Sequence, residues 1–153
     1  MQEDVPRDSA ASGRDDALVA ALRARGQRVT SQRVVIHRLL GELDRHVTAE
    51  EVLRGAAERL PGIALPTVYA TLDLFTELGL ARRVAVGGPV LYDPRTEEHA
   101  HARCRACGRV EDLDGAPLDS APLLAAARAA GFRAEAAELV VDGLCAACAR
   151  AVA

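Results

Sequence analysis

The stretch EEHAHARCRACGRVEDLD, from Glu97 to Asp114, contains two histidines, two cysteines and several carboxylates. Thiolates are soft metal ligands, whereas imidazoles and carboxylates are harder ones, and one ion rarely needs both kinds side by side. The composition of this stretch therefore indicates two metal sites with two different roles.

The four cysteines of the chain form two CxxC pairs, Cys104 with Cys107 and Cys145 with Cys148. Two such pairs suit a closed tetrahedral site, in which Zn²⁺ takes four thiolates at about 2.3 Å. The 37 residues between the pairs (108–144) exceed a compact zinc ribbon, so each pair is expected at the end of a separate strand. We predict structural zinc; four unrelated buried thiols or a redox dithiol are the alternatives.

A second set of candidate ligands contains no thiol. His99 and His101 alternate along a predicted strand, so their side chains should point to one face. His46 lies near the start of a predicted helix, and closure of the two halves of the chain could bring it to the same site. Asp93 and Asp112 flank the histidine pair in the sequence. This set suits Fe²⁺ or Mn²⁺ better than closed zinc, although a surface histidine or aspartate is usually only solvated.

The first half of the chain, which contains His46, is predicted to be mainly helical. Apolar spacing predicts four helices, at about residues 15–25, 32–43, 49–60 and 66–78. Gly26 is expected to end the first helix, and Ser31 can cap the second. Thr48 and Glu51 form a T-x-x-E capping box for the third. His37, on a helix face, is predicted to be a surface histidine or a satisfied core histidine.

Two short strands follow the fourth helix, because ARRVAV and VLYD flank a Gly-Gly turn. Helices followed by a hairpin predict a winged helix-turn-helix, with the fourth helix in the major groove of DNA and the hairpin as the wing. The second half is mixed, with strands expected at HARC, GRVEDL and ELVVDG and a helix near Pro117–Ala130. The predicted fold class is therefore α+β.

Charge is unevenly distributed along the 153 residues, whose net charge is −3. Residues 14–83 contain 11 Arg and 9 acidic residues, whereas residues 84–153 contain 7 Arg and 10 acidic residues. The slightly basic first half permits nucleic-acid binding without showing it. The N-terminal residues have no apolar segment typical of a secretion signal, and no run is long enough to span a membrane, so a cytoplasmic location is predicted.

The segments RVTSQR, HVTAEEV, LPTVYATLDLFTELGL, HAHARCRACG and GLCAAC, in this order, resemble the ferric uptake regulator (Fur) superfamily. The resemblance implies a homodimeric, metal-dependent transcriptional repressor rather than an enzyme. It implies a winged-helix DNA-binding domain over residues 14–92 and a metal-binding α/β dimerisation domain over 93–153. The acidic, polar N-terminal residues 1–13 are predicted to be a disordered tail. Residues implied to contact operator DNA are Arg28, Arg33, Thr67 and Tyr69.

Within the superfamily, the peroxide-responsive (PerR-like) branch is the most similar. Its regulatory ligands correspond to His46, Asp93, His99, His101 and Asp112. Iron-uptake relatives usually carry Glu at the position of Asp93. They often have an extra metal site, and two of the positions that supply its ligands are occupied in this chain by Ala100 and Ala137. The resemblance implies that Fe²⁺ at the regulatory site promotes oxidation of His46 or His99 by peroxide, followed by loss of metal and release of DNA.

Three other functions are compatible with the sequence. The same scaffold serves iron, manganese or zinc uptake regulators, which the ligand types alone do not exclude. A metalloenzyme would need a substrate pocket and a nucleophile or general base, and no such motif is evident. A zinc-stabilised interaction module is the third alternative, for which the acidic second half is the only hint.

Overall fold

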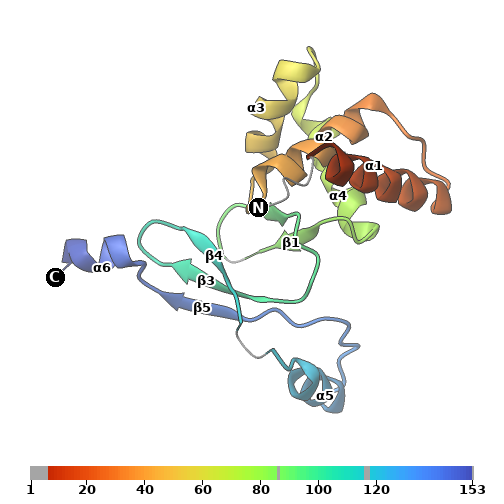
Figure 1. The fold of residues 1–153 in the computed structure, drawn as a ribbon. Coiled ribbons are helices and arrows are strands. Elements are labelled where there is room, and N and C mark those ends of the chain that lie inside the picture. The colour runs from red at the N-terminus through yellow and green to blue at the C-terminus, as the bar shows by residue number, and fades with distance from the viewer. Residues whose placement is uncertain (1–6, 86, 116–117, 153) are drawn as a thin grey trace, which may run out of the picture. The chain divides into compact units, whose positions relative to one another are not determined.

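The computed structural model describes residues 7–85, 87–115 and 118–152 of the chain. The chain divides into two compact units, with the boundary between Thr96 and Glu97. Figure 1 labels the helices and strands of both. The predicted boundary between residues 92 and 93 was four residues too early, because Asp93 pairs with a strand of the first unit.

The first unit, within the described residues, consists of four helices followed by an antiparallel hairpin (Figure 1). The helices are α1 (Arg7–Ala24), α2 (Ser31–Leu43), α3 (Ala49–Arg59) and α4 (Leu65–Glu77), and the strands are β1 (Arg82–Val84) and β2 (Leu91–Asp93). In the hairpin, Arg82 pairs with Asp93 and Val84 pairs with Leu91. This order of elements confirms the predicted winged-helix arrangement.

The core of the first unit is formed by one apolar face of each helix and by the hairpin. Fully buried members of this core include Leu18, Leu22, Ile36, Val52, Val68, Leu72, Phe75 and Val47. On α1 and α4 the named residues recur every three or four positions, which places them on one side of each helix. Burying one such side chain contributes about 1.5–3 kcal/mol, so packing rather than helix propensity holds these short helices.

Helix ends follow the capping residues, with one shift. The Thr48 hydroxyl accepts the backbone N–H of Glu51, and the Glu51 carboxylate accepts the N–H of Thr48 at 2.8 Å, which confirms the capping box. The cap of α2 is Thr30 rather than Ser31, because the Thr30 hydroxyl accepts the N–H of Arg33 and Ser31 is already helical. Gly26 ends α1 with a positive φ of 66°, as predicted.

Helix α1 begins earlier than the sequence analysis expected. It starts at Arg7, so the predicted disordered tail over 1–13 is wrong for residues 7–13, and residues 1–6 lie outside the described part. Between Arg7 and Ala24 the sequence has no proline, and Ala10 and Ala11 have high helix propensity. The acidic, polar composition on which the prediction rested therefore does not interrupt the helix.

The second unit contains β3 (Ala100–Cys104), β4 (Val110–Leu113), α5 (Ala121–Ala129), β5 (Val140–Gly143) and α6 (Ala146–Val152). In the described residues its sheet has the order β4-β3-β5, in which β3 is antiparallel to β4 and parallel to β5. The three predicted strands are confirmed. The predicted helix near Pro117–Ala130 is α5, although Pro117 lies outside the described residues, and α6 was not predicted.

Candidate metal centres and DNA-binding surface

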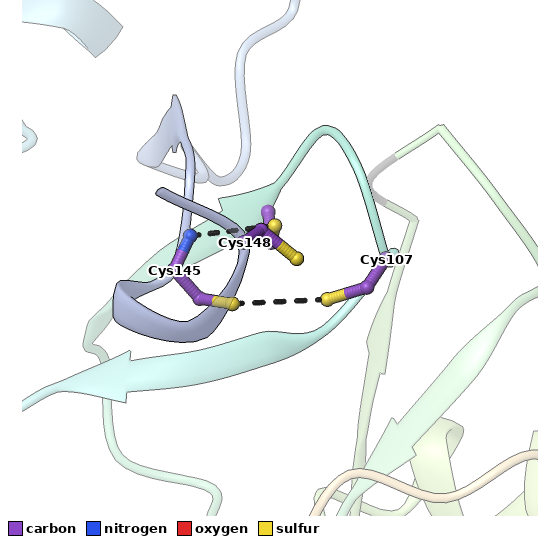
Figure 2. Close-up of side chains that lie close together, drawn as sticks. Cys107, Cys145 and Cys148 are labelled. Carbon is purple, nitrogen blue, oxygen red and sulfur yellow. Dashed lines mark hydrogen bonds between the residues drawn. The ribbon is translucent and has the colours of Figure 1, made fainter. Parts of the chain in front are cut away.

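The four cysteines converge at one place in the second unit. Their sulfur atoms lie within 4.8 Å of one another, and all four are free thiols. Figure 2 shows Cys107 and Cys145 pointing toward each other, with their Sγ atoms 3.9 Å apart. Four sulfurs at about 2.3 Å around one Zn²⁺ ion would be separated by about 3.8 Å, so the cluster has the dimensions of a tetrahedral zinc site.

The topology explains the long interval between the two cysteine pairs. Strands β3 and β5 run parallel, with Cys104 in register with Gly143, so both strands end at the same edge of the sheet. Cys104 is the last residue of β3, and Cys145 follows the end of β5 by two residues. The residues between the pairs form β4, α5 and β5, and the expectation that each pair lies at a separate strand end is confirmed.

Local hydrogen bonds favour the thiolate form of Cys104. The backbone N–H groups of Cys145 and Cys107 lower the pKa of Cys104 to about 6, and the N–H of Cys145 lies 3.3 Å from the Cys104 sulfur. Neighbouring thiols raise the pKa of Cys148 to about 12. Four thiolates in one place repel one another, and a divalent cation removes that repulsion, so the donor set fits Zn²⁺.

The first unit contributes one imidazole–carboxylate pair. Val47 and Tyr92 form an isolated antiparallel bridge, with N–H···O distances of 3.0 and 2.8 Å. This bridge places the flanking residues, His46 and Asp93, opposite each other, and His46 Nε2 lies 3.4 Å from Asp93 Oδ2. The other oxygen of Asp93 accepts the backbone N–H of Arg95 at 2.8 Å, which fixes the orientation of the carboxylate.

The second unit contributes two imidazoles and a carboxylate. His101 is in register with Asp112 on the paired strands β3 and β4. Asp112 Oδ1 lies 3.1 Å from His99 Nε2 and 3.7 Å from His101 Nε2. The two imidazole rings are 4.5 Å apart between centroids, which confirms that both histidines face the same side.

A hydrogen bond on the far side of the ring orients His99, and a more distant carboxylate faces the far side of His101. His99 Nδ1 lies 2.7 Å from the carbonyl oxygen of Glu97, so a proton on Nδ1 leaves Nε2 as the ligand atom. His101 Nδ1 lies 3.9 Å from the carboxylate of Glu138, which the sequence analysis did not identify. Glu138 precedes β5, which pairs with β3, so only the strand order reveals this contact.

Three of the four predicted DNA-contacting residues line one groove on the first unit. Arg28, Arg33 and Thr67 belong to its lining, between the α1–α2 connection and the start of α4, and its volume is about 640 Å³. Tyr69 is on α4 and is 37% exposed, so it is a surface residue and not a core aromatic. Its hydroxyl donates to a carboxylate oxygen of Glu50 at 3.0 Å.

His37 is not part of either candidate metal centre. Its ring is half-buried and stands edge-on to Phe75, with centroids 5.6 Å apart and an interplanar angle of 83°. Burial lowers the pKa of His37. A half-buried imidazole packed against a core aromatic matches the second of the two predictions for this residue, a core histidine rather than a surface one.

Residues 24–141 match the model of the ferric uptake regulator family. The chain belongs to this family. It is 34% identical over 130 residues to ferric uptake regulation protein 2 of Mycolicibacterium fortuitum, covering 83% of this chain and 89% of that protein. It is 32% identical over 130 residues to the peroxide operon regulator of Bacillus subtilis (strain 168), covering 84% and 89%.

A solved structure supports the same assignment. The ferric uptake regulator from Pseudomonas aeruginosa with manganese is 28% identical, with a TM-score of 0.62, covering 83% of this chain and 96% of that one. As a member of the ferric uptake regulator family, the chain is a metal-dependent transcriptional regulator and not an enzyme. Among the described residues, no helix is both long and apolar enough to cross a bilayer.

Proposed function

We propose that the chain is a homodimeric repressor that binds operator DNA when its regulatory site holds metal and releases DNA after peroxide oxidises that site. Structural Zn²⁺ occupies the four-cysteine cluster. The regulatory site holds Fe²⁺ or Mn²⁺ on His46, Asp93, His99, His101 and Asp112. The observation that carries this proposal is the sorting of donors: four thiols gather in one cluster, whereas imidazoles pair with carboxylates in both units.

One regulatory ion is proposed to take ligands from both units. Asp93 is the last residue of β2 and His99 precedes β3, so only five residues separate these two ligands in the sequence. An ion held by both would restrict how the winged helix is presented relative to the rest of the dimer. Metal occupancy would thereby control DNA binding, in line with the metal-dependent regulation of the family.

Hydrogen bonds within the chain fix the orientation of two proposed ligands, which suits a hard divalent ion. The N–H of Arg95 holds one oxygen of Asp93, and the carbonyl of Glu97 holds Nδ1 of His99, so the opposite atoms of both side chains are directed at the site. Bound Fe²⁺ supplies one-electron chemistry with peroxide, which Mn²⁺ does not supply efficiently. An imidazole of His46 or His99 that gains oxygen becomes a poorer ligand, and the DNA-binding form is lost.

Exposed apolar residues in the second unit support a dimer. Phe132 is 71% exposed, Val141 is 57% exposed and Leu123 is 52% exposed, which is unusual for large apolar side chains on a small domain. Strand β5, which carries Val141, is at the edge of its sheet. A second copy of the chain would cover such surface, and zinc would reinforce a unit with so small a core of its own.

The test is operator binding with each metal before and after peroxide. Duplexes selected by the Mn²⁺-loaded protein from a random-sequence pool serve as probes for fluorescence anisotropy. We expect Fe²⁺-loaded protein to lose binding after peroxide and to gain one oxygen atom on His46 or His99 by mass spectrometry, while the Mn²⁺ form resists.

The second candidate is an iron, manganese or zinc uptake regulator. The 34% identity to a ferric uptake regulation protein favours it. Binding that depends on metal concentration, with no histidine oxidation and no release by peroxide in the Fe²⁺ form, would establish this alternative in place of the peroxide sensor.

A further inference from the structure

The connection between α1 and α2 carries Arg28, which is exposed at the groove described above. Both ends of this connection are fixed by hydrogen bonds. The N–H of Gln27 donates to the carbonyl of Leu22 at 2.8 Å, and the N–H of Val34 donates to the carbonyl of Thr30 at 3.1 Å. The middle of the connection needs a different support, because it makes no helix or strand.

Arg33 supplies that support from the first turn of α2. One terminal nitrogen of its guanidinium donates to the carbonyl oxygen of Arg28, and the other donates to Oε1 of Gln27 at 3.1 Å. The guanidinium therefore spans two consecutive residues of the connection, and Arg33 is half-buried while Arg28 is exposed. Bonds from a charged donor are stronger than neutral ones, and a planar fork can reach two acceptors at once.

We propose that Arg33 is a positioning residue for DNA recognition: it holds the backbone carbonyl of Arg28 and the side chain of Gln27 so that the Arg28 side chain is presented to a phosphate. This inference rests on operator binding by the first unit, and it replaces the expectation that Arg33 itself contacts operator DNA. Ordering an exposed arginine and its backbone costs conformational entropy on binding. Bonds already made in the free protein remove part of that cost, so Arg33 acts through Arg28.

A phosphate-contacting role and a positioning role of Arg33 predict different affinities for the Arg33→Lys variant. A phosphate contact tolerates Arg33→Lys, because an ammonium is also a phosphate ligand of unit charge. The positioning role does not tolerate it, because one ammonium cannot reproduce two divergent bonds to Arg28 and Gln27. The two roles also differ in additivity, since a residue that acts through Arg28 has nothing left to do once Arg28 is removed.

The experiment compares Arg33→Lys, Arg28→Ala and the double variant with the full-length wild type, all loaded with Mn²⁺. The probe is a duplex that wild type has selected from a random pool, and affinity is measured by anisotropy between about 50 and 200 mM salt. We expect each single variant to bind about 5- to 20-fold more weakly and to lose about one unit of salt slope per protomer, the value of one phosphate contact. The double variant should match Arg28→Ala.

A second measurement uses the protein without DNA. In Arg33→Lys, amide hydrogen exchange of residues 27–30 should accelerate, while exchange in α4 stays as in wild type. Gln27→Ala, which removes one of the two acceptors, should accelerate the same amides to a smaller degree. Arg38→Lys is the matched control, since Arg38 is an α2 arginine that forms a two-nitrogen bridge elsewhere, to Asp15.

Wild-type affinity in Arg33→Lys would overturn the proposal, as would a double variant whose loss is the product of the two single losses. Unchanged exchange of residues 27–30 in Arg33→Lys would overturn it as well. If the wild-type protein selects no sequence from the pool, operator recognition itself is refuted. This outcome is distinct from any change in the affinities of the variants, which tests only the role of Arg33.

Discussion

Lengthening one carboxylate, that of Asp112, is expected to separate metal binding from peroxide sensing. Asp112 Oδ1 lies 3.1 Å from His99 Nε2 and 3.7 Å from His101 Nε2. Ligand atoms at about 2.0–2.2 Å from one ion, at right angles to each other, are separated by about 3.0 Å. The 3.1 Å separation fits two atoms that share an ion at a right angle, and the 3.7 Å separation fits a wider angle at the same ion.

Asp112→Glu adds one carbon–carbon bond, about 1.5 Å, which is half of the distance to His99 Nε2. The longer carboxylate is expected to bind with both oxygens, and its second oxygen would take the coordination position that the five proposed ligands leave for peroxide. Charge and ligand type are unchanged, so Mn²⁺-dependent DNA affinity should stay within about threefold of wild type. Oxidation by peroxide in the Fe²⁺ form should fall by about tenfold or more, equivalent to about 1.4 kcal/mol in barrier.

The assay combines anisotropy on a selected duplex with mass spectrometry of the peptides that contain His46 and His99. Asp112→Ala should lose metal-dependent DNA binding altogether. Glu111→Asp is the control, because Glu111 is the neighbouring residue on β4, is exposed and pairs with Arg109. If Asp112→Glu were oxidised as fast as wild type, the reasoning from ligand geometry would be refuted.

Four further outcomes are expected. Cys148→Ser should release about one equivalent of Zn²⁺ and lower Tm, because structural zinc contributes folding free energy; an unchanged Tm after zinc loss would contradict this. Tyr69→Ala should weaken specific DNA binding by roughly 1–3 kcal/mol with little change in Tm, since Tyr69 is 37% exposed; a binding loss that tracks unfolding would argue against direct contact. Thr48→Ala should reduce the free energy of unfolding by about 1 kcal/mol in urea titrations, and no loss would mean that the capping box is dispensable. Burial and the hydrogen bond to Asp73 raise the pKa of Tyr92 to about 12. The Tyr92 hydroxyl therefore ionises at lower pH in the unfolded chain, and wild type should lose stability relative to Tyr92→Phe as pH rises from about 10 through 12. Parallel pH profiles of stability for the two proteins would refute this.

Much of the cysteine cluster could be predicted from spacing. Two CxxC pairs indicate thiolate ligation, and the interval between them excludes a compact ribbon. The reason that Cys104 and Cys145 meet is the parallel pairing of β3 with β5, which depends on a crossover through α5. Periodicity identifies each strand but does not state which strands are neighbours, so the contact of His101 with Glu138 was missed for the same reason.

The differences between the predicted and the observed fold have local causes. The cap of α2 moved from Ser31 to Thr30, because adjacent hydroxyl residues are both competent caps and the backbone selects the one with extended geometry. Composition predicted a tail where α1 continues to Arg7. Asp93 was assigned to the second domain because it precedes the histidine pair, whereas its backbone belongs to the hairpin.

The placement of Asp93 follows from the alternation of side chains along β2. Tyr92 points into the core, where it is 1% exposed, and its hydroxyl donates to Asp73 on α4 at 2.9 Å. The next side chain, Asp93, points the other way and meets His46, whose own neighbour Val47 is bridged to Tyr92. One strand therefore carries, on consecutive residues, a candidate metal ligand and an anchor of the helix expected to read DNA. Because the two side chains share one backbone, an ion bound to the Asp93 carboxylate would act on the same strand that packs against α4. Within this unit, such coupling would need no separate connecting element.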